Sequence, residues 1–171
     1  MNPAAHPLRS ALLLVLVLVA TVLNAHISHA GTSFVAVDIA GESFQLEIAN
    51  DNPSRNQGLS FRDHIPTNGG MLFVFPDARK RGFWMRNCLV DMDILFLDRA
   101  GFVVHATEMF AEPLKGENES HASYHKRLKR YSSRHPAQFA LELKHGTMAR
   151  LGIGVGDSIL FNRAELVKAA Q

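Results

Sequence analysis

The sequence predicts a mainly β fold, a compact single-domain sandwich or barrel-like sheet with one or two short helical turns. Short segments with alternating or wholly apolar residues recur between turns that contain Gly or Pro. No apolar pattern continues at helical spacing beyond about three turns. Residues 31–171 are enough for one hydrophobic core and too few for two comfortable domains, so we predict a single β domain over this range.

The N-terminal residues 1–30 have the features of a secretory signal peptide. Arg9 precedes an apolar run over residues 11–23, and Ser28 and Ala30 are small residues at a cleavage site. The run is shorter than the ~20 residues of a membrane-spanning helix, so retention as an uncleaved anchor is the alternative. The cleavage site has no cysteine, which argues against a lipoprotein. We therefore expect cleavage after Ala30 and an exported protein, periplasmic or extracellular.

The first elements expected after the leader are two strands and a helical turn. Residues 33–39 and 44–48 alternate with period two around Gly41, which is typical of a β-hairpin. Asn52 is a residue type that caps helices, and Pro53 suits the first helical position. A short helical turn is therefore predicted from there to about residue 59.

The middle of the chain predicts two further pairs of strands. Residues 71–75 and 83–86 are apolar or aromatic and are joined by a charged, turn-rich connection. Residues 93–98 and 102–106 flank Gly101 as a second compact hairpin. If the strand at 83–86 stays regular, residues of alternating number from Phe83 onward face opposite sides.

The last third of the chain predicts one strand, one helical turn and one terminal strand. Residues 138–143 form the first strand, and Thr147 is placed to cap a turn that Gly152 closes. Residues 158–161 follow a Gly-Asp turn. The polar segment at about 111–136 has no regular period, so we predict a long surface loop, which in compact domains is usually functional or disordered.

Charge and cysteine content limit the function classes. The formal net charge is +2, which does not suggest a nucleic-acid-binding protein. Cys88 is the only cysteine, so it is buried, paired with another chain or reactive, and burial is favoured. Methionines, His105 and Cys88 are soft ligand types, but no HxxxH or CxxC pattern is present. We predict no cofactor and no metal site.

Five short strings in a fixed order carry a resemblance to a known family. They lie at residues 58–62, 70–75, 83–87, 93–98 and 141–157. Over about residues 34–162 the chain resembles the domain of unknown function 192 family, also called uncharacterised protein family 0127. The resemblance implies a compact, mainly β domain, commonly secreted, without an established reaction. The chain departs from the family pattern at residues 88–91 and lacks the cysteines often found before Leu141.

Four residues are candidates for a ligand pocket: Arg62, Trp84, Asn87 and Asp93. Binding sites combine an apolar wall with a few placed polar groups, which this set would supply. The alternative for Asn87 and Asp93 is that they hydrogen-bond to the backbone of the turn between them. The alternative for Arg62 is an ion pair with Asp93, Asp98 or Glu142.

Residues 121–135 form the strongest local charge feature, with five Lys or Arg, three His and no acid. Such a segment can bind polyanions, anionic headgroups or an acidic partner. The candidate contact residues are Lys126, Arg127, Lys129, Arg130 and Arg134. The alternative is a solvated loop whose charge is balanced by the upstream Glu112, Glu117 and Glu119.

Together these features predict a binding or accessory module of the cell envelope, with an anionic envelope component or an acidic protein as partner. They predict no specific nucleic-acid partner, and membrane contact only through an uncleaved leader or the surface. The alternative is a hydrolase acting on envelope material, with a cleft around Arg62, Asn87, Asp93 and Cys88. A reactive Cys88 would need His105 or His64 within hydrogen-bond reach.

Overall fold

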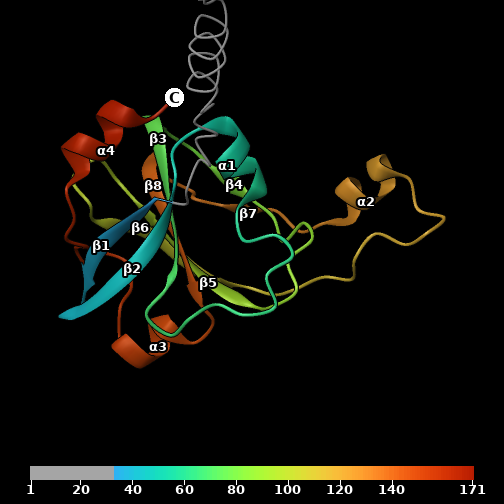
Figure 1. The fold of residues 1–171 in the computed structure, drawn as a ribbon, viewed down its shortest axis with the longest axis horizontal. Coiled ribbons are helices and arrows are strands. Elements are labelled where there is room, and N and C mark those ends of the chain that lie inside the picture. The colour runs from blue at the N-terminus through green and yellow to red at the C-terminus, as the bar shows by residue number, and fades with distance from the viewer. Residues whose placement is uncertain (1–32) are drawn as a thin grey trace, which may run out of the picture. The chain divides into compact units, whose positions relative to one another are not determined.

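The computed structural model describes residues 33–171 (Figure 1). The predicted signal peptide and its cleavage site after Ala30 lie outside the described residues. The mainly β prediction is confirmed: strands predominate and the four helices are short. The strands are β1 (Phe34–Ile39), β2 (Glu42–Ala49), β3 (Gly70–Arg79), β4 (Gly82–Phe83), β5 (Met92–Leu97), β6 (Val103–Met109), β7 (Tyr131–Ser132) and β8 (Ala137–Lys144). The helices are α1 (Asn52–Gln57), α2 (His121–Arg127), α3 (Thr147–Leu151) and α4 (Arg163–Ala169). None of the helices described is long and apolar enough to span a bilayer.

Six strands form one mixed sheet in the order β1-β2-β3-β8-β5-β6. The β2–β3 pair is parallel, and the other neighbours are antiparallel. A separate two-stranded sheet pairs β4 with β7. Within the described part of the chain the strands do not close into a barrel. Because parallel neighbours need a crossover connection, the chain between β2 and β3 leaves the sheet and carries α1 over it.

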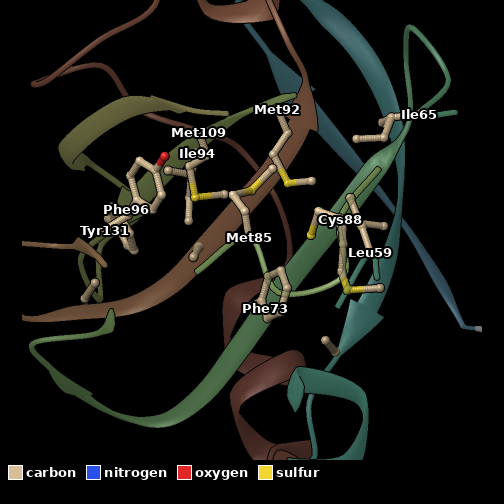
Figure 2. Close-up of a cluster of buried hydrophobic side chains, with 14 residues drawn as sticks. Leu59, Ile65, Phe73, Met85, Cys88, Met92, Ile94, Phe96, Met109 and Tyr131 are labelled. Carbon is tan, nitrogen blue, oxygen red and sulfur yellow. The ribbon is translucent and has the colours of Figure 1, made fainter. Parts of the chain in front are cut away.

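Both faces of the six-stranded sheet are covered, which explains why every residue of β5 is buried. Successive strand residues point to opposite faces, and Leu95 and Phe96 accordingly belong to two different hydrophobic clusters. Side chains from α3 and α4 pack on the cluster that contains Leu95. The other, here called the sulfur-rich cluster, contains Met71, Met85, Cys88, Met92 and Met109 beside Phe73 and Phe96 (Figure 2). Flexible Met side chains fill irregular gaps in such a core.

The predicted strand at 83–86 is wrong beyond its first residue. β4 ends at Phe83, and the chain then turns, with the Cys88 amide donating to the Met85 carbonyl oxygen (3.2 Å). Asn87 has a positive φ of 59°, and its carbonyl oxygen accepts from the Phe61 amide at 2.7 Å. The alternation expected from Phe83 onward is therefore lost, and Met85 is buried in the sulfur-rich cluster while Trp84 is half-buried outside it.

Residues 111–136, here called the arm, contain regular structure that was predicted as a loop. Helix α2 lies to the side of the main sheet (Figure 1). The Ser120 side chain caps it by accepting from the Ser123 amide. Tyr124 is its only buried residue, so the helix has no apolar stripe that a periodicity argument could detect. The Tyr124 hydroxyl donates to Asn87 Oδ1 (3.2 Å) and accepts from the Asn87 amide (2.9 Å), which anchors the arm.

Smaller differences concern the helix caps and the last strand. Asp51, one residue before the predicted cap, closes a capping box with Ser54 at the start of α1. Thr147 begins α3 without a side-chain cap bond, whereas Gly152 ends it in the left-handed conformation as expected. The predicted strand at 158–161 makes only isolated bridges through Ser158 and Leu160.

Candidate functional site

A cavity of about 530 Å³ lies where α1, the end of β3, β4 and the turn after it meet. Six cationic side chains line it: Arg55, Arg79, Lys80, Arg81, Arg86 and Arg130. Its single carboxyl group is that of Glu142. The walls between them are aromatic or apolar, from Leu59, Phe73, Phe75, Phe83 and Trp84. We call this site the basic cavity.

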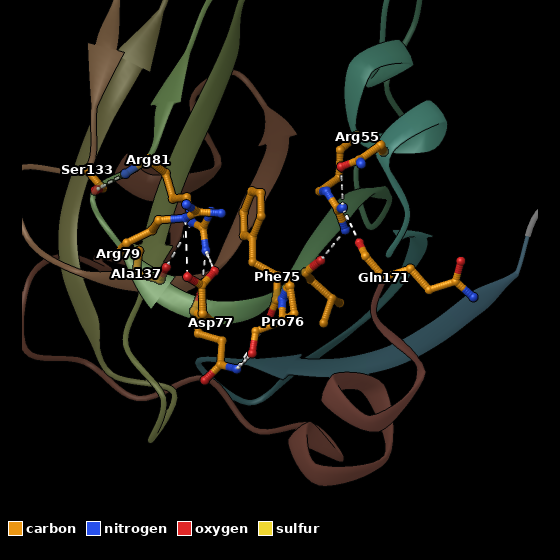
Figure 3. Close-up of polar contacts among 12 residues, drawn as sticks. Arg55, Phe75, Pro76, Asp77, Arg79, Arg81, Ser133, Ala137 and Gln171 are labelled. Carbon is orange, nitrogen blue, oxygen red and sulfur yellow. Dashed lines mark hydrogen bonds and ion pairs between the residues drawn. The ribbon is translucent and has the colours of Figure 1, made fainter.

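Arg55 and Arg81 are fixed on the two sides of Phe75 (Figure 3). The Arg81 guanidinium carbon lies 3.9 Å from the Phe75 ring centre, and its side chain is 10% exposed. Arg81 donates to Asp77 Oδ1 (2.6 Å) and to the Ala137 carbonyl oxygen (3.3 Å). Arg55 donates to the Val74 carbonyl oxygen (2.9 Å) and to a Gln171 oxygen. Both guanidinium groups are therefore held in place before any ligand arrives.

Burial changes the pKa of these groups without discharging them. Desolvation lowers the pKa of Arg81, and the hydrogen bond and charge of Asp77 oppose this effect. The same hydrogen bond lowers the pKa of Asp77. An Arg side chain titrates so far above neutral pH that it stays charged. Asp77 contacts both Arg79 and Arg81, and its single negative charge can balance the positive charge of only one of them.

Trp84 forms the other wall and holds a second pair of guanidinium groups. The Arg130 guanidinium lies 3.8 Å from the Trp84 ring centre, and that of Arg86 lies 5.1 Å from it. Such cation–π contacts orient the cation and leave its edge free to donate. Arg86 also donates from Nη2 to the Asn56 carbonyl oxygen (3.0 Å), while its buried Nε has no hydrogen-bond partner among the described residues.

Glu142 and Cys88 lie at the buried end of the cavity. The Glu142 side chain extends from β8 toward the sulfur-rich cluster, and its Oε2 finds no hydrogen-bond partner in the described part of the chain. Burial raises the pKa of Glu142 to about 8. Its carboxyl group is therefore mostly protonated at neutral pH, since an isolated charge there would be costly. Burial and the nearby Glu142 raise the pKa of Cys88 to about 12.

The native Cys88 thiol is expected to react slowly with iodoacetamide near neutral pH. Only the thiolate is nucleophilic, and a buried thiol with this pKa forms almost none. Alkylation followed by mass spectrometry should give a slow native reaction and a rapid one in denaturant. Labelling at the same rate in both states would contradict the buried assignment.

The four predicted ligand residues lie in different places. Trp84 lines the basic cavity, and Asn87 lines a neighbouring one. Arg62 forms an exposed ion pair with Glu47 (2.8 Å). Asp93 is buried and accepts from the amides of Gly146 (3.2 Å) and Met148 (2.7 Å) at the start of α3. The structure thus brings only Trp84 to the basic cavity, and ligand binding by the other three stays a prediction.

Asp93 also belongs to a group of potential metal ligands with Glu108 and His145, whose ligand atoms lie within 4.8 Å of one another. Both Asp93 oxygens are already used by backbone amides, and Glu108 pairs with His145 Nε2 at 3.2 Å. These hydrogen bonds and this ion pair are sufficient to explain why Asp93, Glu108 and His145 lie close together.

The five predicted contact residues of the arm also differ in their surroundings. Arg130 lines the basic cavity on Trp84, and Lys129 lies over the Tyr131 ring at 4.7 Å. Arg127 is paired with Glu119 (2.7 Å) and donates to carbonyl oxygens of the arm, so it is used to hold the arm together. Lys126 and Arg134 are exposed and line neither of the two cavities described above.

Sequence reasoning missed most of the basic cavity. The cations at residues 79–81 were assigned to a charged turn, and Arg55 to a helical turn without a role. Glu142 was predicted only as part of the strand at 138–143 and as a possible partner of Arg62. The one available signal was the run of three cations beside an aromatic segment, Phe73 to Phe75.

Comparison with protein families identifies the chain. The model of family DUF192, described as "Uncharacterized ACR, COG1430", matches residues 35–161. The chain belongs to this family. The resemblance predicted from the five strings is thereby confirmed. No curated protein matches this DUF192 chain.

Two solved structures resemble the DUF192 chain over most of its length. One is a "putative transcription regulator" from Sinorhizobium meliloti 1021, with 29% identity and a TM-score of 0.61 over 76% of this chain and 95% of that one. The other is a protein of unknown function from Novosphingobium aromaticivorans DSM 12444, with 27% identity and a TM-score of 0.62 over 78% and 89%. These likenesses support the fold and name no ligand.

Proposed function

We propose that this DUF192 domain is a binding module that holds an anionic ligand in the basic cavity. The observation that carries the proposal is the charge of the lining: six cationic side chains face one carboxyl group, which burial keeps protonated. Cations that are not neutralised by nearby acids attract and orient anions. In the exported setting predicted from the leader, the ligand is an anionic component of the cell envelope.

The arrangement of the guanidinium groups supports binding of carboxylate, phosphate or sulfate. Arg81 and Arg130 are stacked on Phe75 and Trp84, so little side-chain entropy is lost when they donate to a ligand. The volume of about 530 Å³ is in the range of small-molecule sites. The alternative, a hydrolase with a cleft around Arg62, Asn87, Asp93 and Cys88, has less support. These four residues do not line one common cavity, and the Cys88 thiol lies against the Arg86 carbonyl oxygen.

Calorimetric titration of the purified protein with citrate, inorganic phosphate and D-glucuronate, against neutral D-glucose, tests the proposal. At least one anion should bind, with an affinity that falls as NaCl rises. The double variant Lys80→Gln/Arg130→Gln removes two exposed cations of the cavity and should weaken binding by about tenfold or more, because charge-assisted hydrogen bonds are lost.

The matched control is Lys126→Gln/Lys168→Gln, which makes the same change in net charge at exposed positions outside the basic cavity. It should leave the affinity within about twofold, as expected for distant surface charges. The proposal is wrong if none of the three anions binds, or if the control pair weakens binding as much as the cavity pair.

A further inference from the structure

A second cavity of about 360 Å³ adjoins the basic cavity on the side of the arm. Lys115, His121 and His125 from the arm line it, together with Phe61 and Leu114, which are exposed apolar residues. Lys115 Nζ donates to the carbonyl oxygens of Gly116 (3.1 Å) and Glu119 (2.8 Å) rather than to a carboxylate. We call this site the arm cavity.

The two cavities share a wall of three side chains. Arg86 lines both of them. Trp84, on the basic-cavity side, lies 4.9 Å from the His125 ring on the arm-cavity side, measured between ring centres. Lys80, Arg130 and Arg86 line the basic cavity, and Arg86 and Lys115 line the arm cavity, so cations are present in both. Cations spread over two adjoining cavities suit a ligand with several charges along its length better than a single compact anion.

Two aromatic rings of the basic cavity are already occupied by protein groups. Arg81 lies on Phe75, and Arg130 and Arg86 lie on Trp84. Single-stranded nucleic acids are bound by stacking bases on open aromatic faces. Guanidinium groups occupy the faces of Phe75 and Trp84, so these two rings offer no free platform to a base, and the basic cavity contacts its ligand there through charge and hydrogen bonds. Phe61 in the arm cavity is exposed, so the comparison with oligothymidylate below tests stacking at that ring.

The uncharged residues that line the basic cavity indicate which chemical groups the ligand carries between its charged groups. Asn52, Gln57 and Ser60 bring amide and hydroxyl groups to the basic cavity, beside apolar walls. Polar side chains of this kind pair with hydroxyl groups, and apolar walls cover carbon–hydrogen surfaces. An inorganic polyphosphate offers neither, whereas a chain of acidic sugars offers both along with regularly spaced anions.

We propose that the two cavities together bind one acidic oligosaccharide, a chain of sugar units bearing carboxylate or sulfate groups, which passes over Arg86 from the basic cavity into the arm cavity. This inference rests on the proposed anion binding and names the class of ligand. The arm thereby supplies part of the binding surface, and Lys115 and His121 contact the part of the oligosaccharide that lies in the arm cavity.

Titration with oligosaccharides of increasing length tests the proposal. Oligogalacturonates of one, two, four and six units and heparin oligosaccharides of two, four and six units distinguish carboxylate from sulfate as the recognised group. In at least one series the affinity should rise about tenfold or more from the shortest to the longest member. Once one sugar unit is bound in the first cavity, the linked units are held at a high effective concentration near the second cavity. Polyphosphate and oligothymidylate of the same charge should bind more weakly.

Variants separate the two cavities. Lys115→Gln/His121→Gln should lower the affinity for the six-unit chain toward that of the shortest chain and leave the latter unchanged. Lys126→Gln, an exposed change on the helix that carries His121 and outside both cavities, should alter neither. Circular dichroism should show that the arm variants stay folded. Lys115→Gln removes two hydrogen bonds within the arm and should lower the melting temperature slightly, whereas His121→Gln alone, at an exposed position, should melt as the unmodified protein does.

The outcomes distinguish this inference from the proposed function. If phosphate or citrate binds but affinity does not grow with sugar-chain length, the oligosaccharide is wrong and anion binding stands. If polyphosphate or oligothymidylate binds more tightly than both sugar series, the ligand class is wrong. If no anion of any kind binds, both proposals fail.

Discussion

Replacing Gly70 by alanine should cost on the order of 4 kcal/mol or more of the free energy of unfolding, a severe loss for one methyl group. Gly70 has a φ of +138°, a backbone conformation that side chains rarely adopt. A Cβ there would overlap the backbone carbonyl oxygen of Glu142 on the neighbouring strand β8. The strands cannot yield easily, because Gly70 pairs with Leu143 at the start of their register. Urea denaturation measures the effect.

Gly82→Ala is the matched control for this prediction. A Cβ on Gly82 meets no atom within 4 Å, and this glycine does not have a positive φ. Its change in stability should stay within about 0.5 kcal/mol. Equal stability of the Gly70 and Gly82 variants would contradict the close approach of β3 and β8.

Glu142 should make the protein less stable as pH rises from about 4.5 to about 8. The pKa of this carboxyl group is about 8 in the folded protein, against 4.5 as its ordinary value, so the folded state binds the extra proton between these pH values. Stability falls with pH wherever the folded state binds more protons than the unfolded state. The contribution is complete below about pH 4.5 and is lost by about pH 8, and it amounts to a few kcal/mol at most.

Chemical denaturation of the unmodified protein and of Glu142→Gln at pH 5, 7 and 9 measures this contribution. The difference in unfolding free energy between the two proteins should shift in favour of the Gln variant as pH rises. The neighbouring Cys88 thiol stays protonated in the folded protein over this range, because burial raises its pKa to about 12. Parallel pH profiles for the two proteins would show that Glu142 is ionised in the folded state.

Local sequence patterns predicted the hairpins of the fold but not the order of the sheet. β1 with β2, and β5 with β6, are joined by short turns, so alternation and turn residues were sufficient. The position of β8 between β3 and β5 depends on pairings between distant segments, which a local pattern does not contain. The arm helix was missed for a related reason, because only Tyr124 faces the protein.

The candidate site was harder to predict because it draws single residues from distant segments. Arg55, Arg81 and Arg130 each look like an ordinary surface cation in its own sequence context. Glu142 looks like the polar face of a half-exposed strand, and only the covering of both sheet faces makes it buried. Trp84 was found because a lone Trp beside Arg is conspicuous in any sequence.

The central place of β8 has a consequence for how a newly made chain reaches its fold. Until residues 137–144 leave the ribosome, the other strands of the six-stranded sheet form two separate groups, β1-β2-β3 and β5-β6, and β3 and β5 each present an unpaired edge. Long-range strand pairing of this kind forms slowly, and the intermediates that precede it are prone to aggregation. Synthesis must therefore be nearly finished before the sheet can join, and chaperones that shield β3 and β5 in the meantime should raise the yield.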